Sequence, residues 1–170
     1  LLIFQNPSEA RPTGGFIGTY GILDLDQGRI KKLFIDGIFN LDGQLNEKIT
    51  PPRPIQKIST AWSTHDANWF ADFSESARKI MSFYEKAGGE TVDGVISLDL
   101  TQYKVEADYD KTLNQPKKIL ADFMPLFLDR LALAAPQNYK EIFKILGDSL
   151  TAKDILFYFS DNSLQKMFSE

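Results

Sequence analysis

The chain has 170 residues, of which 43% are hydrophobic and 25% charged, and a formal net charge of −4. This composition is typical of a globular protein rather than a disordered segment, and the length suits one domain, residues 1–170, with a sizeable core. The acidic balance argues against a nucleic-acid partner, and the lack of cysteine with a single histidine excludes thiol catalysis, iron–sulfur clusters and multi-histidine metal sites.

The first half of the chain predicts a series of strands. Residues 1–5 are expected to form a buried strand, and residues 6–15 a loop with two prolines and paired glycines. Residues 16–24 and 29–36 are predicted to be two strands joined by a hairpin turn. In the first of these, both alternating sets of side chains are partly apolar, which favours a central strand. Residues 37–54 are polar and turn-rich, which predicts a surface excursion.

The second half is predicted to alternate between helices and strands. Ser74 is expected to cap a helix that runs to about residue 87 and ends at Gly88. The other predicted elements are a strand over 92–98, a helix from 115 that Pro125 kinks or splits, a helix over 139–146 that ends near Gly147, a strand over 155–159 and a helix over 163–168. This order predicts a single α/β (α+β) domain with a mixed β-sheet flanked by helices.

The chain opens on an apolar run that is typical of the interior of a buried strand rather than of the start of a protein. No apolar run approaches the roughly 20 residues that span a bilayer, and no basic segment precedes an apolar one as in a signal peptide. We therefore expect a longer parent protein, with any membrane anchor upstream of this chain.

The segment from Arg11 to Gly15 is a first candidate site. Successive glycines after a strand can turn backbone N–H groups inward to form an anion-binding nest, and Arg11 can add a bidentate grip on a phosphate or carboxylate. The segment lacks the lysine and the spacing of a P-loop. The alternative, which we favour, is a tight turn that uses the backbone freedom of Gly14 and Gly15.

A second candidate segment contains His65, Asp66, Asn68 and Trp69. Asp66 can orient His65 as a general base, and Asp, Asn and Trp together can bind a sugar. The alternative is a buried turn in which Asp66 and Asn68 satisfy loop backbone and Trp69 anchors the loop in the core. We favour the structural role for His65 and leave both interpretations open for Asp66 and Asn68. We expect the Arg11 segment to face Asp66 and Asn68 across one cleft.

Other charged residues are weaker candidates. Asp36 is one of several carboxylates near predicted strand ends, which are suitable Mg²⁺ ligands but also common turn residues. Lys117 and Lys118 lie at the start of a predicted helix, where cations can hold a phosphate, and two solvated lysines are the simpler interpretation. The ligand-binding candidates are Arg11, Thr13, Gly14, Gly15, Asp66, Asn68, Trp69, Lys117 and Lys118, and the metal candidate is Asp36.

Three ordered motifs resemble a bacterial family known as domain of unknown function 4012 (DUF4012). They are FQNPSEARPTGGFIGTYGIL at 4–23, Asp-Ala-Asn-Trp at 66–69 with an Asp-Phe pair following, and Asp-Gly-Val-Ile at 93–96. In that family the last motif is followed by a helix and a further strand. Here the chain continues directly into the tail, so we expect a segment to be missing near residues 100–101.

That family is in turn similar to the LytR–CpsA–Psr family. Its enzymes use Mg²⁺, Arg and Asp to transfer glycopolymers from a polyprenyl-pyrophosphate carrier to peptidoglycan, and they are membrane-anchored with the catalytic domain outside. The resemblance implies a LytR–CpsA–Psr-like fold and an extracytoplasmic location. The enzyme motifs match poorly: Asp36 is all that remains of one motif, and Lys117 and Lys118 stand where the family has paired arginines.

The resemblance thus implies two functions. We expect a non-enzymatic extracytoplasmic module of a membrane-anchored cell-envelope protein, which binds a glycopolymer or a surface protein without a cofactor and meets the membrane only through an anchor outside this chain. The alternative is a Mg²⁺-dependent, phosphotransferase-like enzyme acting on polyprenyl-pyrophosphate-linked glycan. A long apolar groove for the carrier lipid would distinguish the two.

Overall fold

The computed structural model describes residues 1–27, 29–99, 126, 130, 133–134 and 136–167. Its strands and helices are β1 (Leu2–Arg11), β2 (Gly14–Asp26), β3 (Arg29–Gly37), α1 (Ile38–Asp42), α2 (Phe73–Lys86), β4 (Gly94–Asp99), α4 (Tyr139–Thr151), β5 (Ile155–Phe159) and α5 (Asn162–Met167). The 3₁₀ turns are η1 (Ile55–Lys57), η2 (Thr64–Asp66) and η3 (Pro136–Asn138).

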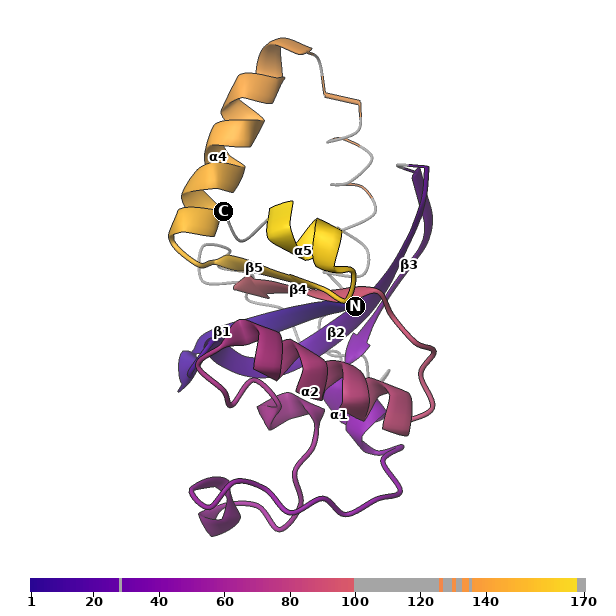
Figure 1. Cartoon of the computed structure of the whole chain (residues 1–170), viewed down its shortest axis with the longest axis vertical. Coiled ribbons are helices and arrows are strands. Elements are labelled where there is room, and N and C mark those ends of the chain that lie inside the picture. The colour runs from indigo at the N-terminus through magenta and orange to yellow at the C-terminus, as the bar shows by residue number, and fades with distance from the viewer. Residues whose placement is uncertain (28, 100–125, 127–129, 131–132, 135, 168–170) are drawn as a thin grey trace.

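The strands form one mixed sheet in the order β3-β2-β1-β4-β5. The pairs β3–β2, β2–β1 and β4–β5 are antiparallel, whereas β1 and β4 run parallel. Figure 1 shows α1 and α2 on one side of the sheet and α4 and α5 on the other. The predicted α+β domain, a mixed sheet flanked by helices, is therefore confirmed.

Strand β1 is apolar on both faces because it lies in the middle of the sheet. Ile3 is completely buried in the larger core cluster, whereas its neighbours Leu2 and Phe4 belong to a second cluster with residues of β2, β3 and β4. Alternate residues of a strand face opposite sides of the sheet. The continuous apolar run at the start of the chain is thus the pattern of a strand covered on both faces, as predicted.

Helix α2 covers the face of the sheet that carries Ile3. Its residues Ala77, Ile80 and Phe83 are completely buried, as amphipathic spacing requires. The helix begins after Asp72, whose Oδ1 accepts a hydrogen bond from the N–H of Ser74 at 2.8 Å. The prediction that Ser74 caps this helix is wrong by two residues, because Asp72 has the extended backbone and the short acceptor side chain that a cap needs.

Residues 6–15, predicted to be a loop, are mostly strand. β1 continues to Arg11, which pairs with Gly14 at the start of β2 across a tight turn. A register shift between Asn6 and Ala10 interrupts the pairing. The prediction failed because such a bulge accommodates the proline and polar residues that otherwise indicate a loop.

Residues 37–54 are not simply the surface excursion predicted. They open with α1, whose Ile38 and Leu41 are 0% and 3% exposed and belong to the main core. The three-residue spacing places both side chains on one face of the helix. A five-residue helix is too short for its periodicity to stand out among the polar and turn-forming residues around it.

The described C-terminal helices and strands are of the predicted types. β5 has the predicted bounds, and β4 and α5 lie within two residues of theirs. Helix α4 continues through Gly147 to Thr151, since a glycine inside a helix costs only about 1 kcal/mol relative to alanine. It ends where Lys153 takes a left-handed conformation with φ 65°. The helix predicted from 115 and the gap expected near 100–101 fall outside the described residues.

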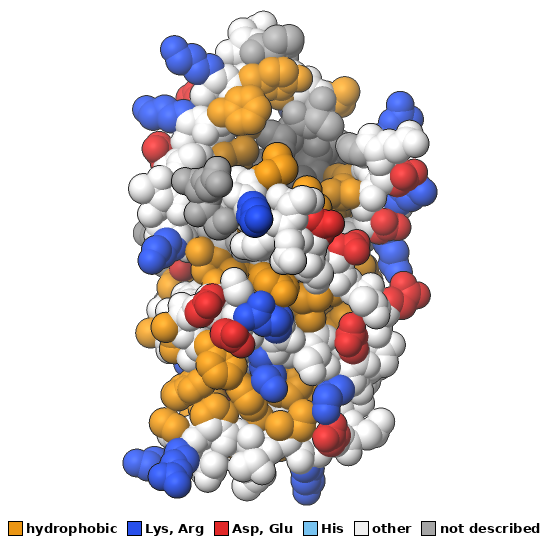
Figure 2. Space-filling view, in the orientation of Figure 1, with side chains coloured by type: hydrophobic (Ala, Val, Ile, Leu, Met, Phe, Trp, Pro, Cys, Tyr) orange, Lys and Arg blue, Asp and Glu red, His pale blue; other side chains and the backbone are white. Residues whose placement is uncertain are grey.

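Helix α4 exposes several apolar side chains. Phe143 and Ile145 are 70% and 57% exposed, and no residue of α4 is buried, so apolar side chains gather over this helix in Figure 2. None of the described helices is long and apolar enough to cross a membrane. The main core of the described chain therefore lies between the sheet and α2.

Candidate functional site

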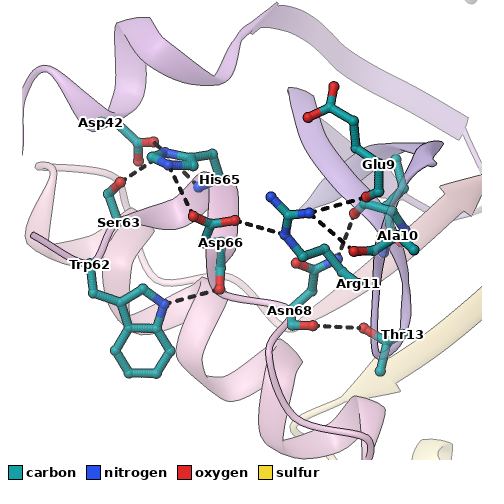
Figure 3. Close-up of polar contacts among 12 residues, drawn as sticks. Glu9, Ala10, Arg11, Thr13, Asp42, Trp62, Ser63, His65, Asp66 and Asn68 are labelled. Atoms are coloured by element: carbon teal, nitrogen blue, oxygen red, sulfur yellow. Dashed lines mark hydrogen bonds and ion pairs between the residues drawn. The ribbon is translucent and has the colours of Figure 1, made fainter. Parts of the chain in front are cut away.

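The segment around Arg11 lies against the segment around Asp66. Arg11 ends β1 and Asp66 ends η2, and Nε of Arg11 donates to Oδ1 of Asp66 at 2.8 Å (Figure 3). Asp66 is 4% exposed, so the ion pair lies at the edge of the core. The two residues that we expected to face each other across a cleft are in direct contact, and they join the β1–β2 hairpin to the loop before α2.

A second nitrogen of the Arg11 guanidinium also bonds within the protein. Its Nη1 donates to the carbonyl oxygens of Glu9 and Ala10 at 3.2 and 3.1 Å. Its central carbon lies 5.5 Å from the centre of the Phe16 ring, a cation–π distance. Arg11 would have to leave Asp66 before it could use Nε in a bidentate grip on an external anion.

His65 lies between two carboxylates. Its Nδ1 is 2.7 Å from Oδ2 of Asp42 and its Nε2 is 3.3 Å from Oδ2 of Asp66. Carboxylates only accept hydrogen bonds, so the form of the ring that suits both contacts is the imidazolium, in which both nitrogens carry a proton. Burial alone would lower the pKa of His65, but the hydrogen bonds to Asp42 and Asp66 outweigh it and raise the pKa to about 9.

This arrangement makes His65 unsuitable as a general base. The Oγ of Ser63 lies 2.9 Å from Nδ1 of His65, a distance that would suit a nucleophile and its base. An imidazolium with both N–H groups engaged has no lone pair with which to accept the hydroxyl proton. The structural role that we favoured for His65 agrees with this geometry.

The two carboxylates are stabilised in their charged form. Burial alone would raise the pKa of Asp42, but hydrogen bonds from His65 and Thr64 lower it below the usual range. The hydrogen bond from His65 lowers the pKa of Asp66 most; burial opposes it, and the bond from Arg11 lowers it further. Arg11, His65, Asp42 and Asp66 thus form a network of two cations and two anions with no net formal charge, here called the charge-paired network.

The turn after Arg11 is held from two sides. The Nδ2 of Asn68, which is 0% exposed, donates to the carbonyl of Gly15 at 2.7 Å, and the hydroxyl of Thr13 donates to the carbonyl of Asn68 at 3.4 Å. On the other side, Oε1 of Gln5 accepts from the N–H of Gly15 at 2.7 Å, while Nε2 of Gln5 donates to Oγ of Ser97 at 2.6 Å. The Gly15 N–H, a donor that an anion nest would need, is therefore used inside the protein.

Both positions of this turn require glycine, because atoms of β1 lie where a Cβ would be. Gly14 has φ 134°, and a Cβ on it would lie 1.8 Å from Oε1 of Gln5. A Cβ on Gly15 would lie 1.9 Å from the backbone oxygen of Asn6. The tight-turn interpretation of these glycines accounts for their positions.

Trp62, which was not predicted as an anchor, holds the loop that carries Asp66 together with Trp69. Trp62 is 7% exposed, its Nε1 donates to the backbone oxygen of Asp66 at 3.0 Å, and its ring meets that of Phe83 edge-on at 5.5 Å. Trp69 is half-buried and packs against the same core. A ligand contact by Trp69 stays a prediction.

Asp36 is engaged locally. Its Oδ1 accepts from the N–H of Gly37 and from Nδ2 of Asn40, both at 2.7 Å, and so stabilises the start of α1. Within the described part of the chain, no group of three or more His, Asp and Glu side chains lies close enough together to hold a metal ion. Lys117 and Lys118 lie outside the described residues.

A cleft of about 500 Å³ lies beside the β1–β2 turn. Its walls are residues 12–14 of the turn, 71–73 at the start of α2, Asp99 at the end of β4, and residues 152–154 with Leu156 at the start of β5. Thr13 and Gly14 are the predicted ligand-binding residues that line it. The others in the described chain, from Arg11 to Trp69, position the turn or pack behind it.

Two residues of the arrangement were not predicted as site residues. Asp42 completes the network from α1, and Gln5 holds the turn from β1 at 1% exposure. Gln5 carried a usable signal, because a polar side chain that ends a buried apolar run needs buried partners. Asp42 was considered only as one of several carboxylates that could bind Mg²⁺ or lie in turns, and nothing in the sequence indicated its pairing with His65.

Comparison with known proteins places the chain in a family. The family described as a protein of unknown function, DUF4012, matches residues 1–105, which include the β1–β2 turn, the network and β4. No curated protein and no solved structure matches the chain. Because the family match covers more than half of the 170 residues, this chain belongs to the DUF4012 family.

Proposed function

We propose that this domain is a non-enzymatic binding module of a membrane-anchored bacterial cell-envelope protein, and that it binds a glycopolymer. The extracytoplasmic location and the anchor outside this chain come from the resemblance to the LytR–CpsA–Psr family. The observation that carries the non-enzymatic part of the proposal is the charge-paired network. Its four ionisable side chains bind one another, so they serve to fix the β1–β2 turn rather than to react with a substrate.

The charges of the network support binding over phosphotransfer. A pyrophosphate-linked substrate carries several negative charges and needs cations that are free to meet it. Arg11 and His65 are each paired with a carboxylate, so the network offers no net positive charge. The cleft beside it is lined by hydroxyl, carboxylate and apolar groups and by one lysine, Lys153, a mixture that suits a hydroxyl-rich polymer.

A thermal-shift titration tests this proposal. Purified cell-wall glycopolymer is expected to raise the melting temperature of the chain, because a ligand that binds only the native state adds about 2.7 kcal/mol at a hundredfold excess over its Kd. A polyprenyl-pyrophosphate analogue is expected to give no shift with or without Mg²⁺. A Mg²⁺-dependent shift with the analogue and none with the glycopolymer would contradict the proposal and favour the phosphotransferase-like alternative. A shift only with a surface protein would replace the glycopolymer as partner.

A further inference from the structure

Helix α4 carries a stripe of apolar side chains along one face. Tyr139, Phe143, Leu146 and Leu150 follow one another at steps of three and four residues, which places them on the same side of an α-helix. All four are exposed, from 39% for Leu146 to 70% for Phe143. The helices of a globular domain normally turn such a stripe toward the core, so this face of α4 indicates a contact outside the domain.

The helix has little support from the rest of the described chain. No residue of α4 is buried, and its main contacts among the described elements are with η3, which precedes it, and with β5, which follows it. Figure 1 shows α4 extending away from the sheet. A helix of 13 residues is only marginally stable on its own, because most helical stability comes from packing of the apolar face. The stripe is therefore expected to have a partner.

The charged residues of α4 are distributed unevenly around the stripe. Lys140 and Lys144 lie along one margin of it, next to Phe143. Glu141 and Asp148 lie on the opposite side of the helix, about half a turn from the stripe. Neither lysine forms an ion pair within the described part of the chain. Figure 2 accordingly shows exposed apolar side chains over α4 with basic side chains beside them.

We propose that α4 lies on an anionic membrane surface, with the stripe turned into the lipid and with Lys140 and Lys144 beside lipid phosphates. Helices that bind in the plane of a membrane combine an apolar face with cations and an aromatic side chain. With 13 residues, α4 is too short to span a bilayer, which takes about 20 residues. This contact goes beyond the glycopolymer-binding role, does not depend on it, and adds to the anchor expected outside this chain.

A second copy of the chain fits this face less well than a membrane. If two copies paired through their stripes, Glu141 and Asp148 of each helix would lie on the side away from the partner. The lysines at the margin of the stripe would then meet no carboxylate of the other α4. An anionic bilayer offers phosphate groups along the whole margin of the helix. Charge complementarity therefore favours the membrane.

Vesicle co-sedimentation of the 170-residue chain tests the proposal. The vesicles contain phosphatidylcholine alone, which is neutral, or an equal mixture with phosphatidylglycerol, which is anionic. Binding to the mixed vesicles is expected to be at least about tenfold tighter than binding to the neutral ones. It is also expected to weaken as the salt concentration rises, because salt screens the lysines. Equal binding to both kinds of vesicle, or binding to neither, would overturn the proposal.

A pair of double variants tests the role of the lysines. Lys140→Gln combined with Lys144→Gln is expected to weaken binding to the mixed vesicles about thirtyfold. Glutamine is as good a helix former as lysine, so α4 itself is retained. Lys48→Gln combined with Lys57→Gln makes the same change of charge at exposed positions between α1 and η2, a segment at the opposite end of the molecule in Figure 1. This control is expected to bind normally.

A pair of single variants tests the role of the stripe. Phe143→Gln is expected to weaken binding to the mixed vesicles at least about tenfold, and it leaves the fold intact because Phe143 is not packed in the core. Phe39→Gln, at a phenylalanine of α1 that is 64% exposed, is the matched control and is expected to bind normally. If both α4 variants bound the mixed vesicles as tightly as the unaltered chain, α4 would not be the contact and the proposal would fail.

Sedimentation velocity without vesicles tests the other occupant. A dimer that Phe143→Gln converts to a monomer would show that a second copy covers the stripe, and it would overturn the proposal. A monomer that binds the mixed vesicles would support it. Titration with glycopolymer in the absence of vesicles is expected to be unaffected by Phe143→Gln. A failure of the membrane contact therefore leaves the proposed binding module standing, and a failure of glycopolymer binding leaves the membrane contact standing.

Discussion

Asp66 is the carboxylate on which two cations converge. Nε of Arg11 lies 2.8 Å from one oxygen and Nε2 of His65 lies 3.3 Å from the other, and the Asp66 side chain is 6% exposed. A buried charge costs most when it has no partner, so the loss of one partner matters more than the net gain of the pair. The network is therefore expected to be sensitive to single substitutions.

Arg11→Met tests this sensitivity. The variant keeps the aliphatic length but removes the ion pair with Asp66, so the free energy of unfolding is expected to fall by about 2–3 kcal/mol. Urea denaturation measures the loss. Arg78→Met is the control, because its pair with Glu75 is exposed and should be worth less than about 1 kcal/mol. Equal effects of the two variants would contradict a buried role for Arg11.

The stability of the chain is expected to depend on pH through His65. The folded pKa of about 9 lies above the unfolded value of 6.5, so the contribution is fully present below pH 6.5 and is lost as the pH rises through 9. The free energy of unfolding is expected to fall by about 2–3 kcal/mol across this range. His65→Gln, which does not titrate, should flatten the profile in urea denaturation series. A profile unchanged by His65→Gln would show that other groups cause it.

At the residue scale, the sequence predicted that Arg11 lies near Asp66, but not that the two side chains form an ion pair within a larger network. Two motifs of one signature suggest proximity, and the structure has them in contact. The pairing that turns His65 into an imidazolium depends on Asp42, which comes from α1 and is 23 residues away. A contact of this kind is set by tertiary packing, which no local pattern encodes.

At the scale of elements, α2 depends on its cap. The side chain of Asp72 accepts from the N–H of Ser74, and Phe73 begins the helix. Asp72→Ala is expected to lower the free energy of unfolding by about 1 kcal/mol, since a helix N–H loses its acceptor. Ser74→Ala is expected to change it by less than about 0.5 kcal/mol. Thermal denaturation of the two variants shows which residue caps the helix. A larger loss of stability with Ser74→Ala would contradict the role of Asp72 and support the cap predicted from the sequence.

Two glycines are expected to respond in opposite ways to alanine. Gly15→Ala would place a Cβ 1.9 Å from the backbone of β1, so the hairpin must move and the free energy of unfolding is expected to fall by at least about 3 kcal/mol. Gly147 lies within α4 with nothing within 4 Å of its Cβ position. Gly147→Ala is expected to raise stability by up to about 1 kcal/mol. Denaturation curves measure both changes, and a Gly15→Ala variant as stable as the unaltered chain would contradict this account of the hairpin.

The type of a strand or helix was predictable where its own hydrophobic pattern determines it. The apolar run of β1, the alternation of β2 and the spacing in α2 gave their type correctly. The extension of β1 to Arg11 was not predicted, because it is stabilised by pairing with Gly14 and by Gln5, not by its own residues. The same holds for α1, which exists because Ile38 and Leu41 find a core to pack into.

At the scale of the whole molecule, the class of the fold was predictable and the strand order was not. A sheet with flanking helices follows from the sequence of element types. The placing of β4 beside β1 brings the hairpin turn, the start of α2 and the start of β5 to one edge, where the cleft lies. That convergence brings residues 12–14 beside residues 152–156, so part of the family signature lines the cleft.

The protonation state of His65 tests the central claim most directly, that the signature residues form a closed network and not a catalytic centre. The chain has one histidine, so a nuclear magnetic resonance titration reports on His65 alone. The account predicts an imidazolium at pH 7, with signals from both ring N–H groups, and a titration midpoint near pH 9. A neutral ring at pH 7, with a midpoint at or below pH 6.5, would contradict it and leave His65 free to act as a base.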